Sequence, residues 1–320
     1  MEPFTIGDMS GSPGEVRRGE LGRIHLADGT PVRIPLVVIQ GSEPGPVLWV
    51  SAAMHGQEIS GIAVVWELMR GRFDPGALRG TVVAAPVLNP LSFTGHTYFT
   101  PQDGYNLHRS FPGDPQGLLT ARLAALIYRE GVEKCDYFVD FHCNPDPALC
   151  FSIIKDPGDE QVWQASQEMA RAFGITTIEM ESRYEAHRTG TLVEAALSLG
   201  KPSLILELIP WRRISPEAVE VGVRGMLNVM KYLDMIDGEI EPQEGVQILD
   251  GRLTRVEIMA SAGGLVKQYK TAGDPVRSGE ILGHIVDVYG DEVEPVVSPV
   301  DGWLLAFPLL NNQAVGTGDI

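Results

Sequence analysis

The chain has 320 residues, of which 44% are apolar, and a formal net charge of −17 at pH 7. This length exceeds the usual size of one hydrophobic core, so we expect one large domain and a smaller one. The negative charge argues against nucleic acid or an anionic membrane surface as a partner, because phosphates would be repelled.

The cysteines and the hydropathy pattern bear on the compartment. Cys135, Cys143 and Cys150 are an odd number in a long chain and do not resemble a disulfide framework. They lie in or near apolar runs, where a free cysteine behaves as a small hydrophobe. No signal-peptide pattern opens the chain, and no apolar run approaches the roughly 20 residues that span a bilayer. We therefore expect a cytoplasmic protein with no membrane partner.

The first two thirds of the chain have the pattern of an α/β domain, which we expect over residues 1–240. Residues 1–45 alternate apolar and polar residues between Gly and Pro, which predicts short antiparallel or edge strands. Apolar strands then alternate with helices, and this predicts a mixed, mostly parallel sheet flanked by helices. The predicted strands are Val47–Ala53, Thr81–Val87, Tyr137–His142, Ala148–Ile154, Ile175–Met180 and Ser203–Ile209.

Helices are expected between these strands. Apolar residues recur at helical spacing over Ile59–Met69 and Leu119–Ile127. Thr191 and Glu194 have the spacing of a capping box at the start of a later helix. Ser215, followed by proline, opens the last helix, which extends to about residue 235.

The last part of the chain has a different pattern. The acidic segment Asp237–Gly245 contains Pro and Gly and is typical of a linker. Beyond it the helical period disappears, and short strands are separated by Gly, Pro and Asp. We expect a small all-β domain over residues 241–320.

Three residues that end strands or follow them have the chemistry of metal ligands. His55 and Glu58, three residues apart in the turn after the strand at 47–53, can reach one cation of the zinc type. His142 ends another strand, at the rim where α/β proteins place their sites. Together they give two histidines and one carboxylate with an open fourth position, as in catalytic zinc sites. Asp140 lies on the same strand face as His142 and can accept a hydrogen bond from the imidazole or from a backbone group.

Further polar residues supply the groups that a hydrolase needs. Glu207 lies inside the apolar run LILELI, where the desolvation of a carboxylate requires compensation. Next to a zinc-bound water, it can accept a proton and return it to a leaving amine. Asn106, His108 and Arg109 lie in Asp103–Gly113, which we expect to be an ordered loop. The arginine can bind a substrate carboxylate through two hydrogen bonds or stabilise an oxyanion.

The ordered set of motifs resembles the succinylglutamate desuccinylase/aspartoacylase family, whose members are zinc hydrolases related in fold to M14 carboxypeptidases. The resemblance covers about residues 45–320 and rests on HGQE at 55–58, NLHRSFPG at 106–113, DFH at 140–142, GTLVEAALSLGKP at 190–202 and LILELIP at 204–210. It implies that His55, Glu58 and His142 bind one Zn²⁺ per chain. It also implies that Glu207 is the catalytic carboxylate and that Arg109 binds a carboxylate of the substrate.

The sequence departs from the family pattern beside the expected substrate. His108 replaces the second asparagine of the usual NLNR motif, and Tyr98 stands where an oxyanion-stabilising arginine is expected. We predict that both residues, together with Asn106, contact the substrate. Neither departure touches the predicted metal ligands, so both bear on the substrate and on catalytic efficiency.

The β domain resembles a barrel-sandwich module of the biotinyl/lipoyl kind. Such carriers need a lysine at a hairpin tip, and the corresponding turn here, Tyr289–Glu292, has none. A shielding or assembly role is therefore expected for this domain. Two remaining histidines, His96 and His187, lie in loop-like stretches and are expected to be surface or pocket-wall residues.

These observations together predict a zinc-dependent deacylase that cleaves the amide bond of a small, anionic N-acyl amino acid or a related amide. Two alternatives stay open. A zinc carboxypeptidase would use the same chemistry on short peptides. A catalytically impaired metal-binding or assembly protein is the other, motivated by Tyr98 and His108. A homo-oligomer is also expected, because related enzymes often associate.

Overall fold

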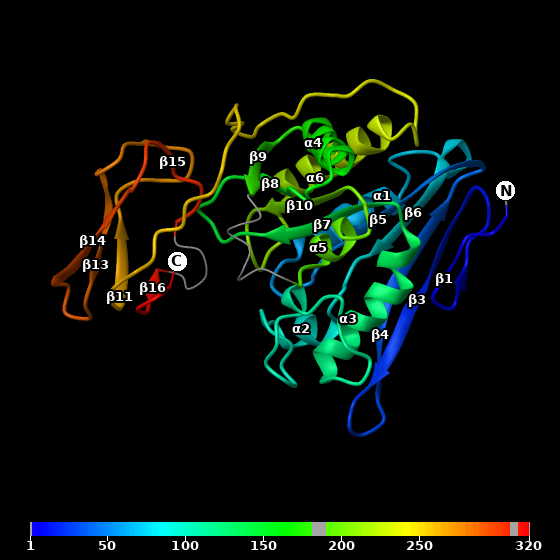
Figure 1. The fold of residues 1–320 in the computed structure, drawn as a ribbon, viewed down its shortest axis with the longest axis horizontal. Helices are drawn as coiled ribbons and strands as arrows, with labels where there is room; N and C mark the ends of the chain where they lie inside the picture. The colour runs from blue at the N-terminus through cyan, green and yellow to red at the C-terminus, as the bar shows by residue number, and fades with distance from the viewer. Residues whose placement is uncertain (1, 181–189, 308–312, 320) are drawn as a thin grey trace.

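The computed structural model describes residues 2–180, 190–307 and 313–319, so His187 lies outside the described residues. An eight-stranded sheet, in the order β3-β4-β6-β5-β7-β10-β8-β9, forms the centre of the larger part (Figure 1). A short antiparallel pair, β1 (Thr5–Ile6) and β2 (Met9–Ser10), precedes it. The strands of the sheet are β3 (Glu15–His25), β4 (Pro31–Gln40), β5 (Glu43–Ser51), β6 (Arg79–Ala85), β7 (Tyr137–Cys143), β8 (Phe151–Lys155), β9 (Thr176–Met180) and β10 (Ser203–Leu208).

The sheet is mixed, with four parallel strands at its centre. Strands β6, β5, β7 and β10 run in the same direction. Strand β4 is antiparallel to β6 at one edge, and β8 is antiparallel to β10 at the other. The central strands are buried along almost their whole length, as expected for strands that are covered on both faces. The predicted fold class, a mixed and mostly parallel sheet flanked by helices, is confirmed.

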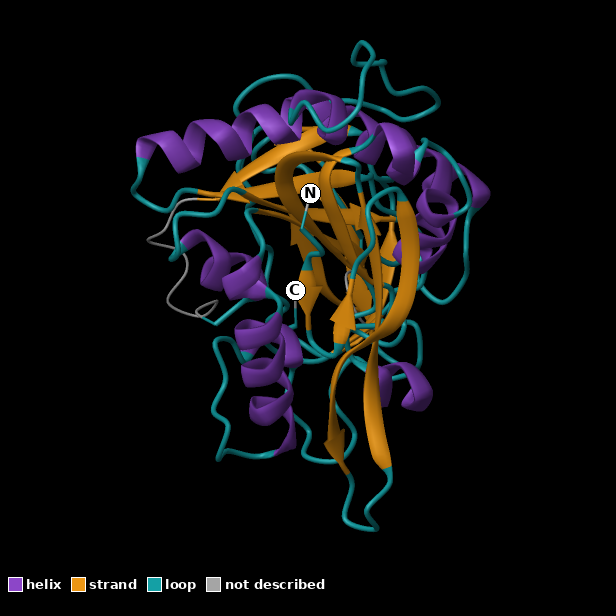
Figure 2. Ribbon diagram, turned by 90° about the vertical axis from the view of Figure 1, so that its right-hand side faces the viewer, coloured by secondary structure: helices purple, strands orange, loops and turns teal. Residues whose placement is uncertain are grey.

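Helices cover both faces of this sheet (Figure 2). Helices α1 (Ser60–Met69), α4 (Glu160–Phe173) and α6 (Pro216–Tyr232) share one apolar core with the sheet. Helices α3 (Leu119–Glu130) and α5 (Leu192–Leu197) share the core on the other face. The connections contain α2 (Pro90–Gly95) and three short 3₁₀ turns, η1 (Pro75–Ala77), η2 (Leu107–Arg109) and η3 (Val132–Lys134). Within the described residues, no helix combines the length and the apolar character needed to cross a bilayer.

Side chains fix the ends of several helices. Thr191 and Glu194 form the predicted capping box at α5, and the Ser215 hydroxyl accepts a hydrogen bond from the backbone N–H of Ala218 in α6. Residues 103–113 form an ordered loop, as predicted, and the loop contains the short turn η2. The Asn106 side chain accepts a hydrogen bond from the backbone N–H of His108 and holds that turn.

The chain after α6 forms a smaller all-β part, as predicted. Residues 233–263 contain no helix or strand, but Glu241 exchanges two hydrogen bonds with the Asn228 side chain of α6. An antiparallel sheet follows, in the order β14-β13-β11-β16. It contains β11 (Gly264–Gln268), β13 (Ile281–Val286), β14 (Glu292–Val297) and β16 (Ala314–Val315), and β12 (Pro275–Val276) pairs with β15 (Gly302–Trp303) beside it. The domain boundary at residue 240 stays a prediction.

The packing of α1 on the sheet gives a first test. Gly61 lies in the first turn of α1, directly after the segment with His55 and Glu58. A Cβ at Gly61 would lie 2.5 Å from the Cβ of Phe141 and 2.9 Å from the Cβ of Ala52, and both neighbours are fully buried. We predict that Gly61→Ala lowers the free energy of unfolding by about 1–3 kcal/mol, because the helix must shift away from the sheet. This cost exceeds the gain of about 1 kcal/mol in helix propensity.

Denaturant unfolding measures the effect. Gly302→Ala is the matched control, because a Cβ at Gly302 meets nothing within 4 Å, and its stability should stay within about 0.5 kcal/mol of the parent. An unchanged stability in Gly61→Ala would contradict the described contact between α1 and β7.

Candidate metal and catalytic site

A tight turn after β5 brings His55 and Glu58 to the carboxyl edge of the parallel strands. Ala53 begins this turn with a left-handed φ of +48°, a conformation that a non-glycine residue rarely adopts. The backbone N–H of Gly56 donates to the Ser92 hydroxyl at 2.9 Å. A Cβ at Gly56 would lie 1.9 Å from the Ser92 carbonyl oxygen. Only glycine therefore fits beside His55.

The three predicted metal ligands converge in the folded chain. His55 Nδ1 lies 2.8 Å from Glu58 Oε1, and His142 Nδ1 lies 2.8 Å from Glu58 Oε2. All three side chains are buried, with 2%, 3% and 3% exposure for His55, Glu58 and His142. Their candidate ligand atoms all lie within 4.8 Å of one another.

The Nε2 atom of each histidine also has a hydrogen-bond partner. His55 Nε2 lies 3.1 Å from Asn106 Oδ1, and His142 Nε2 lies 3.0 Å from Asp140 Oδ2. Asn106 Oδ1 is fixed as an acceptor because it also accepts the His108 backbone N–H. Both partners can hold a hydrogen on Nε2, so that with a metal ion bound each Nδ1 would present its lone pair to the ion. Asp140 makes the predicted contact with His142, and its other oxygen accepts the Ser51 hydroxyl at 2.6 Å.

This arrangement requires positive charge at its centre. Burial alone would raise the pKa of Glu58, but His55 and His142 lower it to about 2. Burial would likewise lower the pKa of His142, but Asp140 and Glu58 raise it well above the ordinary value. A proton on an imidazole or a metal cation can supply that charge. Two imidazole nitrogens and a carboxylate suit zinc, whose ligand atoms lie roughly 3.3 Å apart in a tetrahedral site. The residues therefore fit a zinc ion with only small displacements.

His108 adjoins the same cluster from η2. Its Nδ1 atom is buried, has no hydrogen-bond partner in the described structure and lies 3.9 Å from Asp140 Oδ2. Burial lowers the pKa of His108 well below its ordinary value, and nearby His142, His55 and Arg109 lower it further. With Asp140 and His142, His108 forms a second group of potential ligands. His142 Nε2 already lies within hydrogen-bond distance of that Asp140 oxygen, so the first group fits a metal ion better.

Glu207 and Tyr98 complete the polar lining. Glu207 of β10 lies directly beside His142 of β7 in a parallel pair, so both side chains project from the same face of the sheet. The Tyr98 ring stacks on His55 with centroids 3.8 Å apart and planes inclined by 16°. Burial raises the pKa of the Tyr98 phenol, and Glu58 and Glu207 raise it further. The phenol therefore stays protonated at neutral pH.

All eight sequence-predicted site residues thus lie in or around one cluster. Arg109 is exposed at the end of η2 and close enough to lower the pKa of both His108 and Tyr98. The eight are His55, Glu58, Tyr98, Asn106, His108, Arg109, His142 and Glu207. Sequence reasoning missed Ser51, whose only signal was its place at the end of an apolar strand. His96 is exposed at the end of α2, as expected of a surface histidine.

The cysteines do not supply a nucleophile. All three are free and buried. Burial raises the pKa of each thiol, including that of Cys143 next to His142. They are small apolar residues of the core, as predicted.

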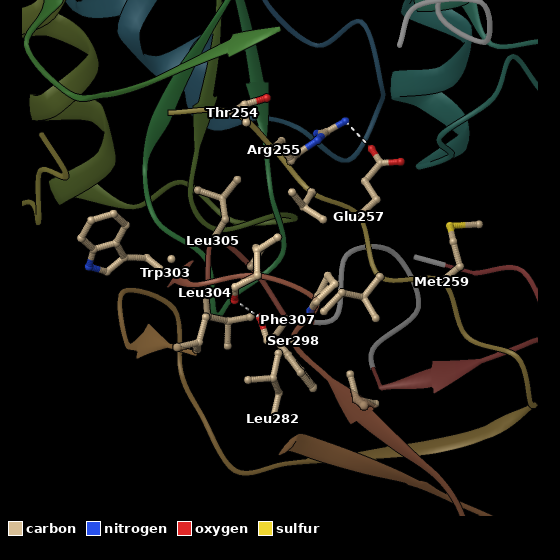
Figure 3. A pocket seen from close by; sticks show the side chains of 18 of the residues that line it. Thr254, Arg255, Glu257, Met259, Leu282, Ser298, Trp303, Leu304, Leu305 and Phe307 are labelled. Carbon is tan, nitrogen blue, oxygen red and sulfur yellow. Dashed lines mark hydrogen bonds and ion pairs between the residues drawn. The ribbon is translucent and has the colours of Figure 1, made fainter. Parts of the chain in front are cut away.

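A separate cavity of about 470 Å³ lies between the all-β part and the edge strands β8 and β9 of the larger sheet (Figure 3). It is lined mainly by apolar side chains such as Leu282, Leu304 and Phe307, with the ion pair between Arg255 and Glu257 at 2.6 Å. Its described lining includes no histidine, no cysteine and none of the eight site residues. The candidate site at the edge of the parallel strands is therefore distinct from this cavity.

Known proteins match the chain over most of its length. Residues 44–233 match the sequence model of the succinylglutamate desuccinylase/aspartoacylase catalytic domain. The N-alpha-acetyl-L-2,4-diaminobutyric acid deacetylase of Halomonas elongata is 29% identical over 271 residues, which cover 83% of this chain and 77% of that protein.

Solved structures share the fold as well. The crystal structure of a succinylglutamate desuccinylase/aspartoacylase from Rhodobacter sphaeroides has a TM-score of 0.82 at 26% identity and covers 95% of this chain and 93% of that one. The product-bound ectoine utilization protein EutE of Ruegeria pomeroyi has a TM-score of 0.83 at 24% identity, with 99% and 96% covered.

The hydrogen bond between Asp140 and His142 predicts an effect on metal affinity. We expect Asp140→Asn to weaken zinc binding by roughly 10- to 100-fold, because an amide in place of the carboxylate no longer fixes the His142 tautomer as strongly. Titration against a chelator of known affinity measures this. Asp136→Asn is the control, since Asp136 lies just before the other end of the same strand, where it accepts a hydrogen bond from the backbone N–H of Val47. Equal zinc affinities in the two variants would contradict the proposed support.

Proposed function

The chain belongs to the succinylglutamate desuccinylase/aspartoacylase family, and we propose on this basis that it is a zinc-dependent deacylase. Its reaction would be hydrolysis of the amide bond of a small N-acyl amino acid or a related amide. The observation that carries the proposal is the convergence of His55, Glu58 and His142, with Glu207 projecting from the same face of the sheet. Three protein ligands leave a position open, which is typical of catalytic rather than structural zinc sites.

We propose one Zn²⁺ per chain, held by Nδ1 of His55, the carboxylate of Glu58 and Nδ1 of His142. When bound, the ion supplies Lewis acidity that polarises a carbonyl group and lowers the pKa of water toward ~7. Asn106 and Asp140 would keep the two imidazoles in the tautomer that binds the metal.

Glu207 is the proposed general base and acid. Its carboxylate would take a proton from the attacking water and deliver it to the nitrogen of the leaving amine. Two features support this role. The side chain projects beside His142. It is also close enough to Tyr98 for its negative charge to raise the pKa of the phenol.

The remaining site residues would hold the substrate. Arg109 can bind an anionic group of the substrate through its guanidinium. Tyr98 retains its proton and can donate a hydrogen bond to the oxygen that becomes negatively charged during attack. Asn106 and the neutral imidazole of His108 would contact polar groups of the same substrate.

The named activities of the matching proteins support an N-acyl amino acid as the substrate class. The family model names a succinylglutamate desuccinylase and an aspartoacylase, and the Halomonas elongata relative is a deacetylase of an acylated diamino acid. None of these names is a carboxypeptidase, so the peptide-cleaving alternative is not favoured. The three free, buried cysteines support a reducing compartment and hence the cytoplasm. The homo-oligomer stays a prediction.

Substitution of the proposed base is the direct test. We expect Glu207→Gln to bind one zinc per chain but to lower kcat by roughly 10²- to 10⁴-fold, because an amide cannot accept the proton. Glu179→Gln is the matched control. Glu179 is also a partly buried strand glutamate, but its carboxylate pairs with Arg252, and activity should be unchanged.

Turnover is measured on N-acetyl and N-succinyl amino acids, with short peptides in parallel. Substantial turnover by Glu207→Gln would refute the assigned base. Hydrolysis of peptides alone would replace the deacylase with the carboxypeptidase.

A further inference from the structure

A buried lysine near the loop that carries Arg109 has no part in the proposed chemistry. Lys155 is the last residue of β8, and its side chain is 3% exposed. Its Nζ atom lies 2.6 Å from Glu194 Oε1. Lysine is almost never fully buried unless it is paired, and a buried ion pair seldom adds stability over an apolar pair of similar size. Its presence therefore points to a role other than stability.

Glu194 connects the lysine to the start of α5. Its second oxygen, Oε2, accepts the Thr191 backbone N–H at 3.0 Å and the Thr191 hydroxyl at 2.7 Å. The Thr191 hydroxyl in turn accepts the Glu194 backbone N–H at 3.1 Å. Helix α5 has only six residues, so its first turn depends on these bonds rather than on its length.

The residue before this cap supports the loop of the proposed substrate-binding arginine. The Gly190 carbonyl accepts the Phe111 backbone N–H at 2.6 Å. A Cβ at Gly190 would lie 2.9 Å from the carbonyl oxygens of both Arg109 and Phe111, so the two backbones are in direct contact. An unbroken series of contacts thus runs from Lys155 through Glu194, Thr191 and Gly190 to Arg109.

We propose that Lys155 and Glu194 are positioning residues, whose buried ion pair sets the place of Arg109 and thereby the affinity for the anionic group of the substrate. The part that concerns substrate affinity rests on the proposed function. The part that concerns the loop does not.

Two variants test the ion pair, one that removes the charge of the lysine alone and one that removes both charges. Lys155→Met removes the ammonium but keeps most of the side-chain length. The double variant Lys155→Met/Glu194→Gln leaves neither charge unpaired, and glutamine can still complete a capping box. Lys134→Met is the matched control, because Lys134 forms an exposed ion pair of 2.7 Å with Glu130.

Hydrogen–deuterium exchange of residues 107–113 is the readout that needs no activity. In this segment the Ser110 N–H donates to Leu107 and the Phe111 N–H donates to Gly190. We expect the amides of this segment to exchange at least 10-fold faster in both Lys155 variants, with exchange in β7 unchanged. Without the ion pair Gly190 is no longer held in place, so the segment opens more often. On an N-acyl amino acid we expect KM to rise about 10-fold, kcat to stay within 2-fold and zinc content to stay at one per chain.

The outcomes separate the two claims. If the wild-type protein hydrolyses no N-acyl amino acid, the proposed function fails, and the exchange data still decide on the positioning role. Wild-type exchange of residues 107–113 in the double variant would overturn that role, because the capping box alone would then suffice. Faster exchange throughout the chain, with kcat and KM changed together, would also overturn it in favour of a purely structural pair.

Discussion

Two imidazole nitrogens and both oxygens of one carboxylate lie within hydrogen-bond distance in the interior of this protein. Only a positive charge between them makes this close approach favourable. Glu58 and His142 are 84 residues apart in the sequence, and both side chains are buried together with His55. Four acceptor atoms at such short range would otherwise repel one another. The hydrogen bonds behind the histidines, the turn after β5 and the glycine beside His55 all serve to keep this cluster together.

The sheet explains why the metal-site cluster can be rigid although the proposed substrate-binding residues lie on loops. Strands β5, β7 and β10 are adjacent and parallel, so their carboxyl ends present His142, Glu207 and the turn with His55 at one edge. Tyr98 and Arg109 approach from connections outside the sheet. A loop residue needs support from a fixed element to bind a ligand with precision, and the start of α5 gives that support here.

The sequence was sufficient for the parts that depend on local pattern or on ordered motifs. Continuous apolar runs located the strands β5 to β10 to within a few residues, and Thr191 with Glu194 located the start of α5. The direction of β8 could not be predicted, since an apolar strand has the same pattern in either direction. The short turn η2 within the predicted loop could not be located, because it depends on one hydrogen bond that the Asn106 side chain accepts. Lys155 was missed because a lysine after an apolar run is typical of a strand that ends in solvent. Only the fold places Glu194 beside it.

The most direct experiment is a crystal structure of the zinc-loaded protein with anomalous diffraction recorded at the zinc absorption edge. We predict a single strong anomalous peak at about 2.0–2.2 Å from Nδ1 of His55, a carboxylate oxygen of Glu58 and Nδ1 of His142. A zinc ion bound through the Nε2 atoms, a zinc ion between His108 and Asp140, or zinc found only on the surface would contradict this account.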